Sequence, residues 1–446
     1  MKSIKPFPSF KDKNVLILGL GLLGRGVKDA IFFAEAGAKV TVTDLKTKEQ
    51  LTDSVKLLQP YKNIRYTLGK HLESDILKSD LIIRNAGVPS TSPFLKLAQD
   101  KKIPVDMDES LFAEFCPCPI IGITGTRGKS TTTTIIYTIL KNLYTKGQVY
   151  LAGNIQGEAT LPLIKIIKPN DLVVLELSSW QLQGFATKKI SPQIAVFTNI
   201  YEDHMNSYSN MESYINDKKN IYKFQKKTDY CVMSKDNTYT VKLAKEVKSQ
   251  LSWFSAKDLD KSWVLKMVGK HNRENAAAAL AVGNILKLPQ NKMKEIICEF
   301  PGLEHRLEFV KKVNDVAFIN DTTSTTPIAG KKALESFKSP LILIAGGATK
   351  NLDQKPFARA ISKITKAIIL LDGTATDELE KQIKFEGGAD KISGRYNNFE
   401  EAIKHAYALS LPGDTILLSP GCASFGLFAN EFDRGHQFKK IVNQLK

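Results

Sequence analysis

The chain has few cysteines and no long hydrophobic run. Its five cysteines are scattered over 446 residues, which argues against a disulfide framework. No apolar run reaches the roughly 18 residues of a membrane-spanning helix, and the first residues lack the apolar segment of a secretory signal. We therefore expect a cytoplasmic protein without membrane insertion. Cys116 and Cys118 have no matching His or Cys pair at zinc-finger spacing, which favours small buried residues at a domain junction.

Arginine-rich tails, aromatic-basic stripes, internal repeats and low-complexity segments are also absent. The net charge is +17, from 63 basic and 46 acidic residues. This charge alone would permit a basic nucleic-acid-binding ATPase. The lysines are spread over the whole chain, however, which favours a solvated surface and local binding of anionic substrates. We expect no nucleic-acid partner.

The length and the order of motifs predict three α/β domains. A chain of 446 residues is too long for one core, and its 43% hydrophobic and 24% charged residues are typical of a globular enzyme. Strand-like runs alternate with helix-like runs, which predicts parallel sheets with ligands at the carboxyl ends of their strands. We expect an N-terminal Rossmann-like domain, a central P-loop ATPase domain with a mainly parallel sheet, and a C-terminal Rossmann-like domain, over residues 1–117, 118–300 and 301–446.

A phosphate-binding loop lies at the start of the predicted central domain. The sequence GITGTRGKST, residues 122–131, follows an apolar strand and precedes a helix-like stretch. Gly125 and Gly128 allow a tight turn whose N–H groups face a triphosphate. Lys129 would reach the β- and γ-phosphates, and the Ser130 hydroxyl would hold Mg²⁺. The alternative is a glycine-rich turn with a chance Gly-Lys-Ser.

A second glycine-rich turn lies near the N-terminus. The sequence GLGLLG, residues 19–24, follows the strand-like NVLIL, and the next strand ends on Asp44, twenty residues after Gly24. This context predicts a nucleotide site in which the acidic residue faces a ribose or a base. An NAD-dependent oxidoreductase would explain this turn, but it would leave the phosphate loop unexplained.

Further polar residues follow predicted strands of the central domain. Glu176 lies near the end of one strand, and Asp203 and His204 follow the next. Their position beside the phosphate loop favours a metal site, against an ordinary edge carboxylate and a surface histidine. Lys218 and Lys219, in the helix that follows, are solvated lysines by composition.

An alanine-rich helix is predicted over residues 269–286. Its first turns carry Asn272 and Asn275 on one surface. The sequence leaves open whether these asparagines are caps or readers of a base edge. In the third domain the loops TTSTTP, GGATKNLD and GCASF follow strand ends, where ligand groups cluster.

Seven motifs in order carry a resemblance to a known family. GITGTRGKST, ELSSWQL, TNIYEDH, GKHNREN, GLEHRLE, IND and LLSPGCASF resemble the motifs of the Mur ligases over essentially the whole chain. The family's phosphate loop reads GxxGxxGK[ST], which accounts for Ile123 at the position of the first Walker glycine. Folate polyglutamate ligases, which belong to the same superfamily, lack the leading domain that residues 1–115 supply here.

The resemblance implies an ATP-dependent ligase of peptidoglycan precursor synthesis. The reaction would add D-glutamate to UDP-N-acetylmuramoyl-L-alanine through an acyl phosphate, in a monomeric enzyme with two Mg²⁺ ions. Lys218 matches the family lysine that is carbamylated. The alternatives are a variant that adds L-glutamate and another Mur-type ligase that adds alanine or a diamino acid.

The resemblance also implies roles for individual residues. The expected catalytic residues are Lys129, Lys218, His204 and Glu176, and the expected metal ligands are Ser130, Glu176, His204 and Lys218. The expected ATP-binding residues are Gly125, Thr126, Gly128, Lys129, Ser130, Thr131, Asn272, Asn275, Arg306 and Asp321. The expected contacts of the UDP substrate are Gly21, Leu22, Leu23, Gly24, Asp44 and Asn154. The expected glutamate contacts are Thr325, Lys350, Ser424 and Phe432.

Three departures from the family pattern bear on this assignment. Thr323 stands where many members have a lysine, and the aromatic residue near the C-terminus is shifted by one position to Phe432. Both changes touch the amino-acid pocket, so they leave L-glutamate open as the incoming residue. Arg127 replaces the usual asparagine of the phosphate loop.

Overall fold

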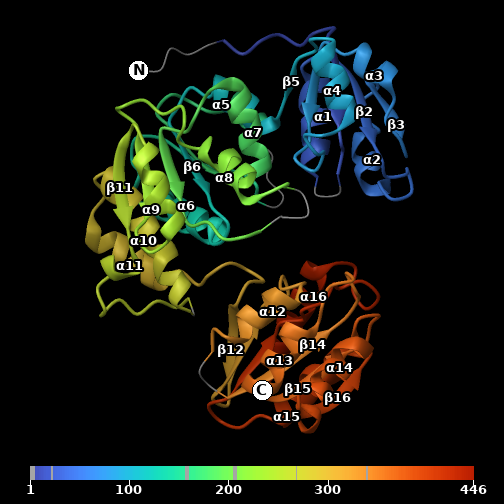
Figure 1. Cartoon of the computed structure of the whole chain (residues 1–446), viewed down its shortest axis with the longest axis vertical. Coiled ribbons are helices and arrows are strands. Elements are labelled where there is room, and N and C mark those ends of the chain that lie inside the picture. Colours follow the sequence, from blue (N-terminus) through green and yellow to red (C-terminus); the bar gives the residue numbers. More distant parts are fainter. Residues whose placement is uncertain are drawn as a thin grey trace. The chain divides into compact units, whose positions relative to one another are not determined.

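The computed structural model describes residues 6–21, 24–155, 160–203, 208–267, 269–337 and 340–445. The chain forms two compact units, Met1–Asp260 with Glu274–Ile297 and Lys261–Arg273 with Cys298–Lys446. Two sheets lie in the first unit and one in the second (Figure 1). The α/β class with mainly parallel sheets is therefore confirmed, while the domain boundaries at 117/118 and 300/301 stay predictions.

The first sheet has five parallel strands in the order β3-β2-β1-β4-β5. The strand residues Val15 to Leu18 are at most 1% exposed, because helices cover both faces of a parallel sheet. The glycine-rich turn follows β1 and ends at α1. The elements are β1 (Asn14–Leu18), α1 (Arg25–Glu35), β2 (Lys39–Asp44), α2 (Thr52–Leu58), β3 (Ile64–Leu68), α3 (Glu73–Leu77), β4 (Leu81–Arg84), α4 (Pro93–Asp100), β5 (Val105–Asp106) and α5 (Asp108–Phe115).

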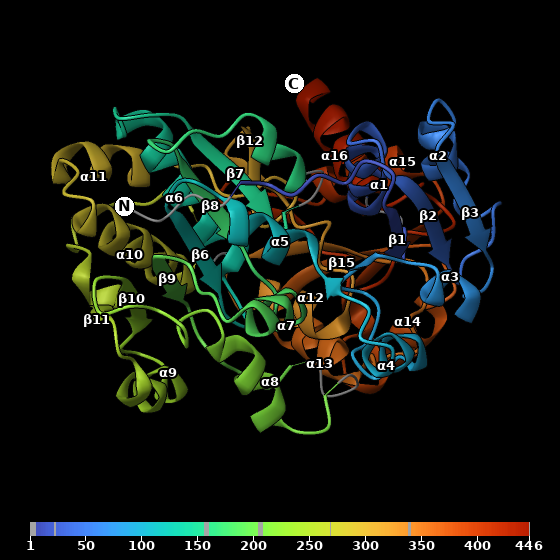
Figure 2. The same ribbon diagram turned by 90° about the horizontal axis from the view of Figure 1, so that it is seen from above.

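The second sheet has six parallel strands in the order β11-β10-β9-β6-β8-β7. Figure 2 shows it from another side, with β6 between β8 and β9. Strands β7, β10 and β11 were not predicted from the sequence. The elements are β6 (Ile120–Thr124), α6 (Lys129–Leu143), β7 (Val149–Gly153), η1 (Leu161–Lys165), β8 (Leu172–Glu176), α7 (Ser179–Lys188), β9 (Ile194–Phe197), α8 (Met211–Lys219), β10 (Tyr230–Ser234), α9 (Thr238–Leu243), η2 (Ala244–Glu246), β11 (Gln250–Phe254), η3 (Ala256–Asp258), α10 (Lys270–Ile285) and α11 (Gln290–Glu299).

The third sheet has the order β12-β13-β17-β14-β15-β16, and only the β12–β13 pair is antiparallel. Helices α12, α13 and α14 contribute to the core on one face, and α15 and α16 to the core on the other. The elements are β12 (Glu308–Val313), β13 (Val316–Asn320), α12 (Pro327–Leu334), β14 (Leu341–Gly346), α13 (Lys355–Ile364), β15 (Thr365–Leu371), α14 (Thr376–Phe385), η4 (Ala389–Lys391), β16 (Ile392–Tyr396), α15 (Phe399–Ala408), β17 (Thr415–Leu418) and α16 (Glu431–Gln444).

Cys116 and Cys118 lie between α5 and β6, in the segment that joins the first two sheets. Both are buried, and their Sγ atoms are 3.6 Å apart without a disulfide bond. This confirms their interpretation as small buried residues. Among the described residues, no helix is both long enough and apolar enough to cross a membrane.

Candidate active site

The phosphate loop is held tightly between β6 and α6. Gly128 has φ +80° at the N-cap of α6, and a Cβ there would lie 2.2 Å from Asn275 Oδ1. Gly125 has φ +148°, and a Cβ there would lie 1.9 Å from Thr198 Oγ1. Any larger residue would clash at either position, so the backbone approaches its neighbours as closely as only glycine allows.

Two lysines meet at the carbonyl groups of this loop. Lys129 Nζ donates to the carbonyls of Gly125 and Thr126 at 3.1 Å, and Lys218 Nζ donates to Gly125 C=O at 2.9 Å. Lys218 is 2% exposed and its ammonium lies 4.8 Å from the ring centre of Tyr214. The interpretation of Lys218 as a solvated lysine was therefore wrong, because α8 turns this residue into the core of the domain.

Burial holds the pKa of the Lys218 amine well below its usual value, and the charge of Lys129 lowers it further. The carboxylates of Asp203, Glu176 and Asp217 act in the opposite direction but do not cancel the effect. The Lys218 amine is therefore unprotonated over a wider pH range than the amine of an exposed lysine. An unprotonated amine is nucleophilic, whereas an ammonium is not.

Glu176 ends β8 inside the sheet, between β6 and β7. It is 1% exposed, and its Oε1 accepts a hydrogen bond from Asn154 Nδ2 at 3.0 Å. Oε2 is buried and has no hydrogen-bond partner among the described residues. An ordinary edge carboxylate would face water, so this orphaned oxygen fits a bound cation.

The other expected residues of the central domain support the loop or lie outside the described part. Thr126 Oγ1 accepts the Tyr201 N–H at 3.0 Å, and Thr131 is 6% exposed. Ser130 is partly exposed in the first turn of α6. His204 lies outside the described residues. The preceding Asp203 pairs with Arg127, whose guanidinium is 3.5 Å away.

Asn275 connects α10 to the phosphate-loop helix. Its Oδ1 accepts the Thr132 hydroxyl at 3.2 Å, and the residue is 5% exposed. This contact is different from a helix cap. Asn272 lies in the first turn of α10, is 9% exposed, and donates its N–H to the Gly269 carbonyl at 3.1 Å.

Sequence reasoning missed Thr198 and Asn199. Thr198 Oγ1 donates to Arg127 C=O at 2.7 Å, and Asn199 Oδ1 accepts the Arg127 N–H at 2.9 Å. These two side chains fix the centre of the phosphate loop from the end of β9. The signal that could have identified them is a polar pair directly after an apolar strand.

In the first sheet, Asp44 at the end of β2 hydrogen-bonds to the glycine-rich turn that follows β1. Asp44 is 5% exposed, and its carboxylate accepts the N–H groups of Gly21 and Lys46, each at 2.9 Å. Gly24 is left-handed at the N-cap of α1. Leu22 and Leu23 lie outside the described residues. Asp44 therefore orders the turn and lies where the sequence predicted an acidic residue.

In the second unit, Lys350 Nζ donates to Thr325 Oγ1 at 2.8 Å, so two of the four expected glutamate contacts lie together. Ser424 is 3% exposed, and its hydroxyl has no partner among the described residues. Phe432 packs against His305, with ring centres 5.7 Å apart. Arg306 is exposed.

Asp321 is 2% exposed and accepts hydrogen bonds from the Leu307 N–H and the Ser419 hydroxyl. Burial nevertheless raises the pKa of this carboxyl to about 6. The folded state therefore favours the protonated acid. Its contribution to stability is complete below the ordinary pKa near 3.8 and is lost as pH rises through about 6.

We expect the variant Asp321→Asn to be more stable than the parent at pH 7, by at most about 3 kcal/mol, and to have no such advantage at pH 4. Asparagine is neutral at both pH values, so it does not pay the cost of a buried charge. Urea denaturation followed by circular dichroism measures the difference. Asp390→Asn, at an exposed aspartate of the same unit, is the control. An equal difference at both pH values would contradict the assignment.

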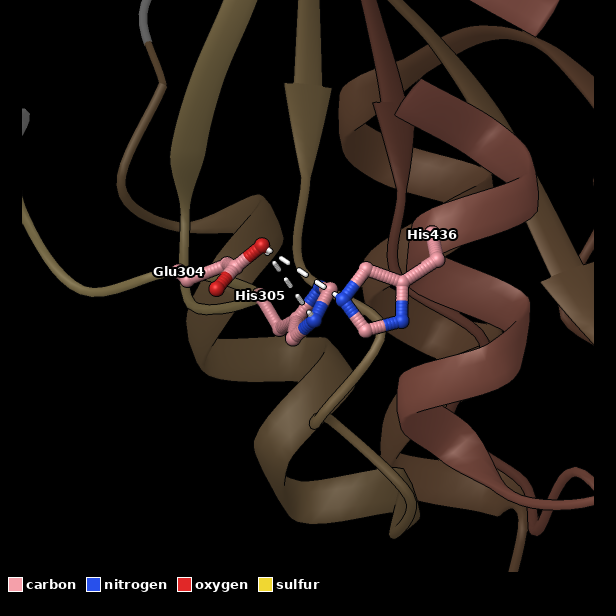
Figure 3. Close-up of side chains that lie close together, drawn as sticks. All are labelled: Glu304, His305 and His436. Carbon is pink, nitrogen blue, oxygen red and sulfur yellow. Dashed lines mark ion pairs between the residues drawn. The ribbon is translucent and has the colours of Figure 1, made fainter. Parts of the chain in front are cut away.

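A cluster of Glu304, His305 and His436 joins the segment before β12 to α16 (Figure 3). Glu304 Oε1 lies 3.8 Å from His305 Nε2 and 3.6 Å from His436 Nε2. The same oxygen accepts the Lys439 ammonium at 2.9 Å, and Asn320 Nδ2 donates to His305 Nδ1 at 3.0 Å. The Lys439 ammonium already neutralises Glu304. Because Nδ1 of His305 accepts the hydrogen bond from Asn320, the proton of a neutral His305 lies on Nε2. The cluster is therefore an ion-pair network rather than a metal centre.

Comparison with known proteins matches three family models to successive parts of the chain. Residues 13–106 match the Mur ligase MurD-like N-terminal domain, residues 123–264 the Mur ligase middle domain, and residues 305–422 the Mur ligase glutamate ligase domain. The order of the three matches follows the order of the three sheets.

Two relatives that match over nearly their full length bear the same name. A UDP-N-acetylmuramoylalanine--D-glutamate ligase of Roseiflexus sp. (strain RS-1) is 35% identical over 96% of this chain and 98% of the relative. Another, of Borreliella afzelii (strain PKo), is 38% identical over 98% of each chain. Among solved structures, the UDP-N-acetylmuramate-alanine ligase MurC of Thermotoga maritima has a TM-score of 0.60 at 18% identity, covering 97% of this chain and 99% of that one. At that identity the likeness supports the fold alone.

Proposed function

The chain belongs to the Mur ligase family, and from this premise we propose that it joins D-glutamate to UDP-N-acetylmuramoyl-L-alanine at the expense of ATP. The family uses ATP, and the glycine-rich loop with Lys129 is the part of this chain suited to a triphosphate. The observation that carries the proposal is the meeting of Lys129 and Lys218 at the Gly125 carbonyl, directly after β6, while the neighbouring strand β8 ends on Glu176 with its orphaned oxygen.

The chemistry begins with a poor electrophile, the carboxylate of the UDP substrate. This carboxylate attacks the γ-phosphorus of ATP, and the products are an acyl phosphate and ADP. The glutamate amine then attacks the acyl carbon, and phosphate leaves with the bonding electron pair. Lys129 would exchange its two loop carbonyls for phosphoryl oxygens and offset the charge that builds up there.

The residues fit a bound metal. We assign Ser130, Glu176 and Lys218 as ligands, together with His204 by resemblance to the family. The buried Oε2 of Glu176 supports this set, because a carboxylate oxygen without a donor suits a hard cation. Mg²⁺, two ions by resemblance, would supply charge neutralisation on the transferred phosphoryl group. Lys218 would serve as a carbamate, formed when its neutral amine attacks CO₂ and releases a proton.

The remaining contacts are assigned by resemblance and by position. Asn272 and Asn275 would lie near adenine, and Arg306 and Asp321 would hold phosphate and ribose. The first turn, with Asp44, and Asn154 would bind the UDP substrate. Thr325, Lys350, Ser424 and Phe432 would hold glutamate, and the unpartnered Ser424 hydroxyl supports this role. Monomeric state, cytoplasmic location and the three domain boundaries are part of the proposal.

Phosphate release from ATP tests the proposal directly. With UDP-N-acetylmuramoyl-L-alanine present, we expect release when D-glutamate is added, and none with L-alanine or meso-diaminopimelate. L-Glutamate is the critical comparison, because Thr323 stands where many family members have a lysine. The Thr323 hydroxyl donates to the His305 carbonyl at 2.8 Å. Release with L-glutamate alone would keep the ligase chemistry and change the substrate. No release with any amino acid would contradict the proposal.

A further inference from the structure

Arg25 extends from the first sheet to the end of a strand in the second. It is the first residue of α1, directly after Gly24 of the glycine-rich turn. Its Nη2 donates to the Gly153 carbonyl at 2.9 Å, and its Nη1 lies 3.7 Å from Glu109 Oε1. The side chain is 20% exposed. Arg25 therefore connects the expected nucleotide turn with the carboxyl end of β7.

The acceptor of Arg25 belongs to the peptide group that holds Glu176. The carbonyl of Gly153 and the N–H of Asn154 are parts of one planar peptide unit. That N–H donates to the Glu176 carbonyl at 2.8 Å, and Asn154 Nδ2 donates to Glu176 Oε1 at 3.0 Å. Gly153 has φ +91°, and a Cβ there would lie 2.1 Å from the Glu176 carbonyl oxygen. Any rotation of this peptide unit would therefore move the groups that orient Glu176.

Three buried carboxyl groups lie near the Arg25 guanidinium. Asp29, one turn along α1, and Asp108 and Glu109 of α5 are at most 4% exposed. Burial and mutual repulsion raise the pKa of Asp29 well above its usual value and that of Asp108 to about 7, while the charge of Arg25 lowers both. A cation surrounded by buried carboxyl groups is shielded from water, which strengthens its hydrogen bond to Gly153.

We propose that Arg25 is a positioning residue for the metal-binding carboxylate of Glu176, acting through the Gly153–Asn154 peptide unit. This inference rests on the proposed role of Glu176 as a metal ligand. Residues that orient a metal ligand commonly change metal affinity 10- to 100-fold when replaced. Arg25 acts through one further residue, so its effect lies at the lower end of this range.

The test is Mn²⁺ binding, followed through the EPR signal of free Mn²⁺ in the presence of ADP. We expect Arg25→Met to weaken Mn²⁺ binding about tenfold. Lys165→Met is the matched control, because Lys165 also joins the two sheets, through Glu35 at 2.7 Å, and its ammonium lies over the Phe32 ring instead of hydrogen-bonding to a carbonyl of β7. The control is expected to bind Mn²⁺ as the parent does.

Two further variants separate positioning from general stability. Glu109→Gln removes the charge partner of Arg25 and leaves the Gly153 contact, so Mn²⁺ binding should be retained. Arg25→Lys keeps a positive charge beside the buried carboxyl groups but loses the planar guanidinium that donates to Gly153, so Mn²⁺ binding should still weaken. This variant keeps the test decisive if Arg25→Met does not fold. A loss in Glu109→Gln as large as that in Arg25→Met would overturn the positioning role.

Glu176→Gln, measured in parallel, distinguishes failure of this inference from failure of the proposed function. If Glu176→Gln weakens Mn²⁺ binding and the folded Arg25 variants do not, the role of Arg25 is overturned and the proposed function stands. If Glu176→Gln binds Mn²⁺ as the parent does, Glu176 is not a metal ligand, and both the assignment and the inference are overturned.

Discussion

Replacing Lys129 by alanine is expected to lower kcat about 10³-fold. The ammonium of Lys129 lies on the loop carbonyls of Gly125 and Thr126, which places it where phosphoryl oxygens would bind. Negative charge moves onto those oxygens as the phosphoryl group is transferred, so a cation there stabilises the transition state more than the ground state. The effect should therefore appear in kcat and in kcat/KM for ATP, measured by phosphate release.

The fold of this variant should be intact. Lys129 is partly exposed at the start of α6, so truncating it to alanine removes little buried side chain. Lys141→Ala is the matched control, because Lys141 lies on the same helix, is exposed, and directs its ammonium to Tyr137. The control should keep full activity and the same melting temperature. Near-normal activity of Lys129→Ala would contradict the assignment of the phosphate loop.

The sequence predicted the parts of the site that depend on local chemistry. Gly125, Gly128 and Lys129 lie in one short loop, and the order of strand, loop and helix around them is visible in the sequence. Glu176 was predicted as a site residue for a similar reason, because a carboxylate at the end of an apolar strand is unusual. Lys218 was misjudged without the resemblance, because its burial depends on how α8 packs against the phosphate loop, a contact between residues about 90 positions apart.

Four strands were not predicted from the sequence, and each omission has an identifiable reason. β7, β11 and β16 are edge strands, only partly buried, and their sequences mix polar residues or glycine with apolar ones. β10 is buried inside its sheet, but its sequence, YCVMS, has a single β-branched residue. The contacts of Arg25 were equally hidden, since an arginine after a glycine-rich turn has no local feature that points to Gly153.

Replacing Lys218 by alanine is expected to abolish turnover, and small carboxylates such as formate or acetate should partly restore it. The amine is buried, its pKa is held well below the usual value, and it donates to the Gly125 carbonyl of the phosphate loop within the electrostatic influence of Asp203 and Glu176. A neutral amine reacts with CO₂, whereas an ammonium does not, so this environment favours a carbamate. The carbamate would convert this amine into an anionic oxygen ligand of the kind that Mg²⁺ prefers.

The adjacent Lys219→Ala is the control, because Lys219 pairs with Glu246, and no hydrogen bond or ion pair joins its side chain to the described residues of the phosphate loop. It should keep its activity and gain nothing from formate. A second measurement is independent of turnover: after equilibration with ¹³C-bicarbonate, the parent and Lys219→Ala should show a carbamate resonance in ¹³C NMR, and Lys218→Ala should not. A parent spectrum without that resonance, together with no rescue at saturating Mg²⁺, would leave Lys218 as a buried hydrogen-bond donor to Gly125. The depressed pKa would then be a consequence of packing alone, because burial lowers the pKa of an amine whether or not the amine has a chemical role.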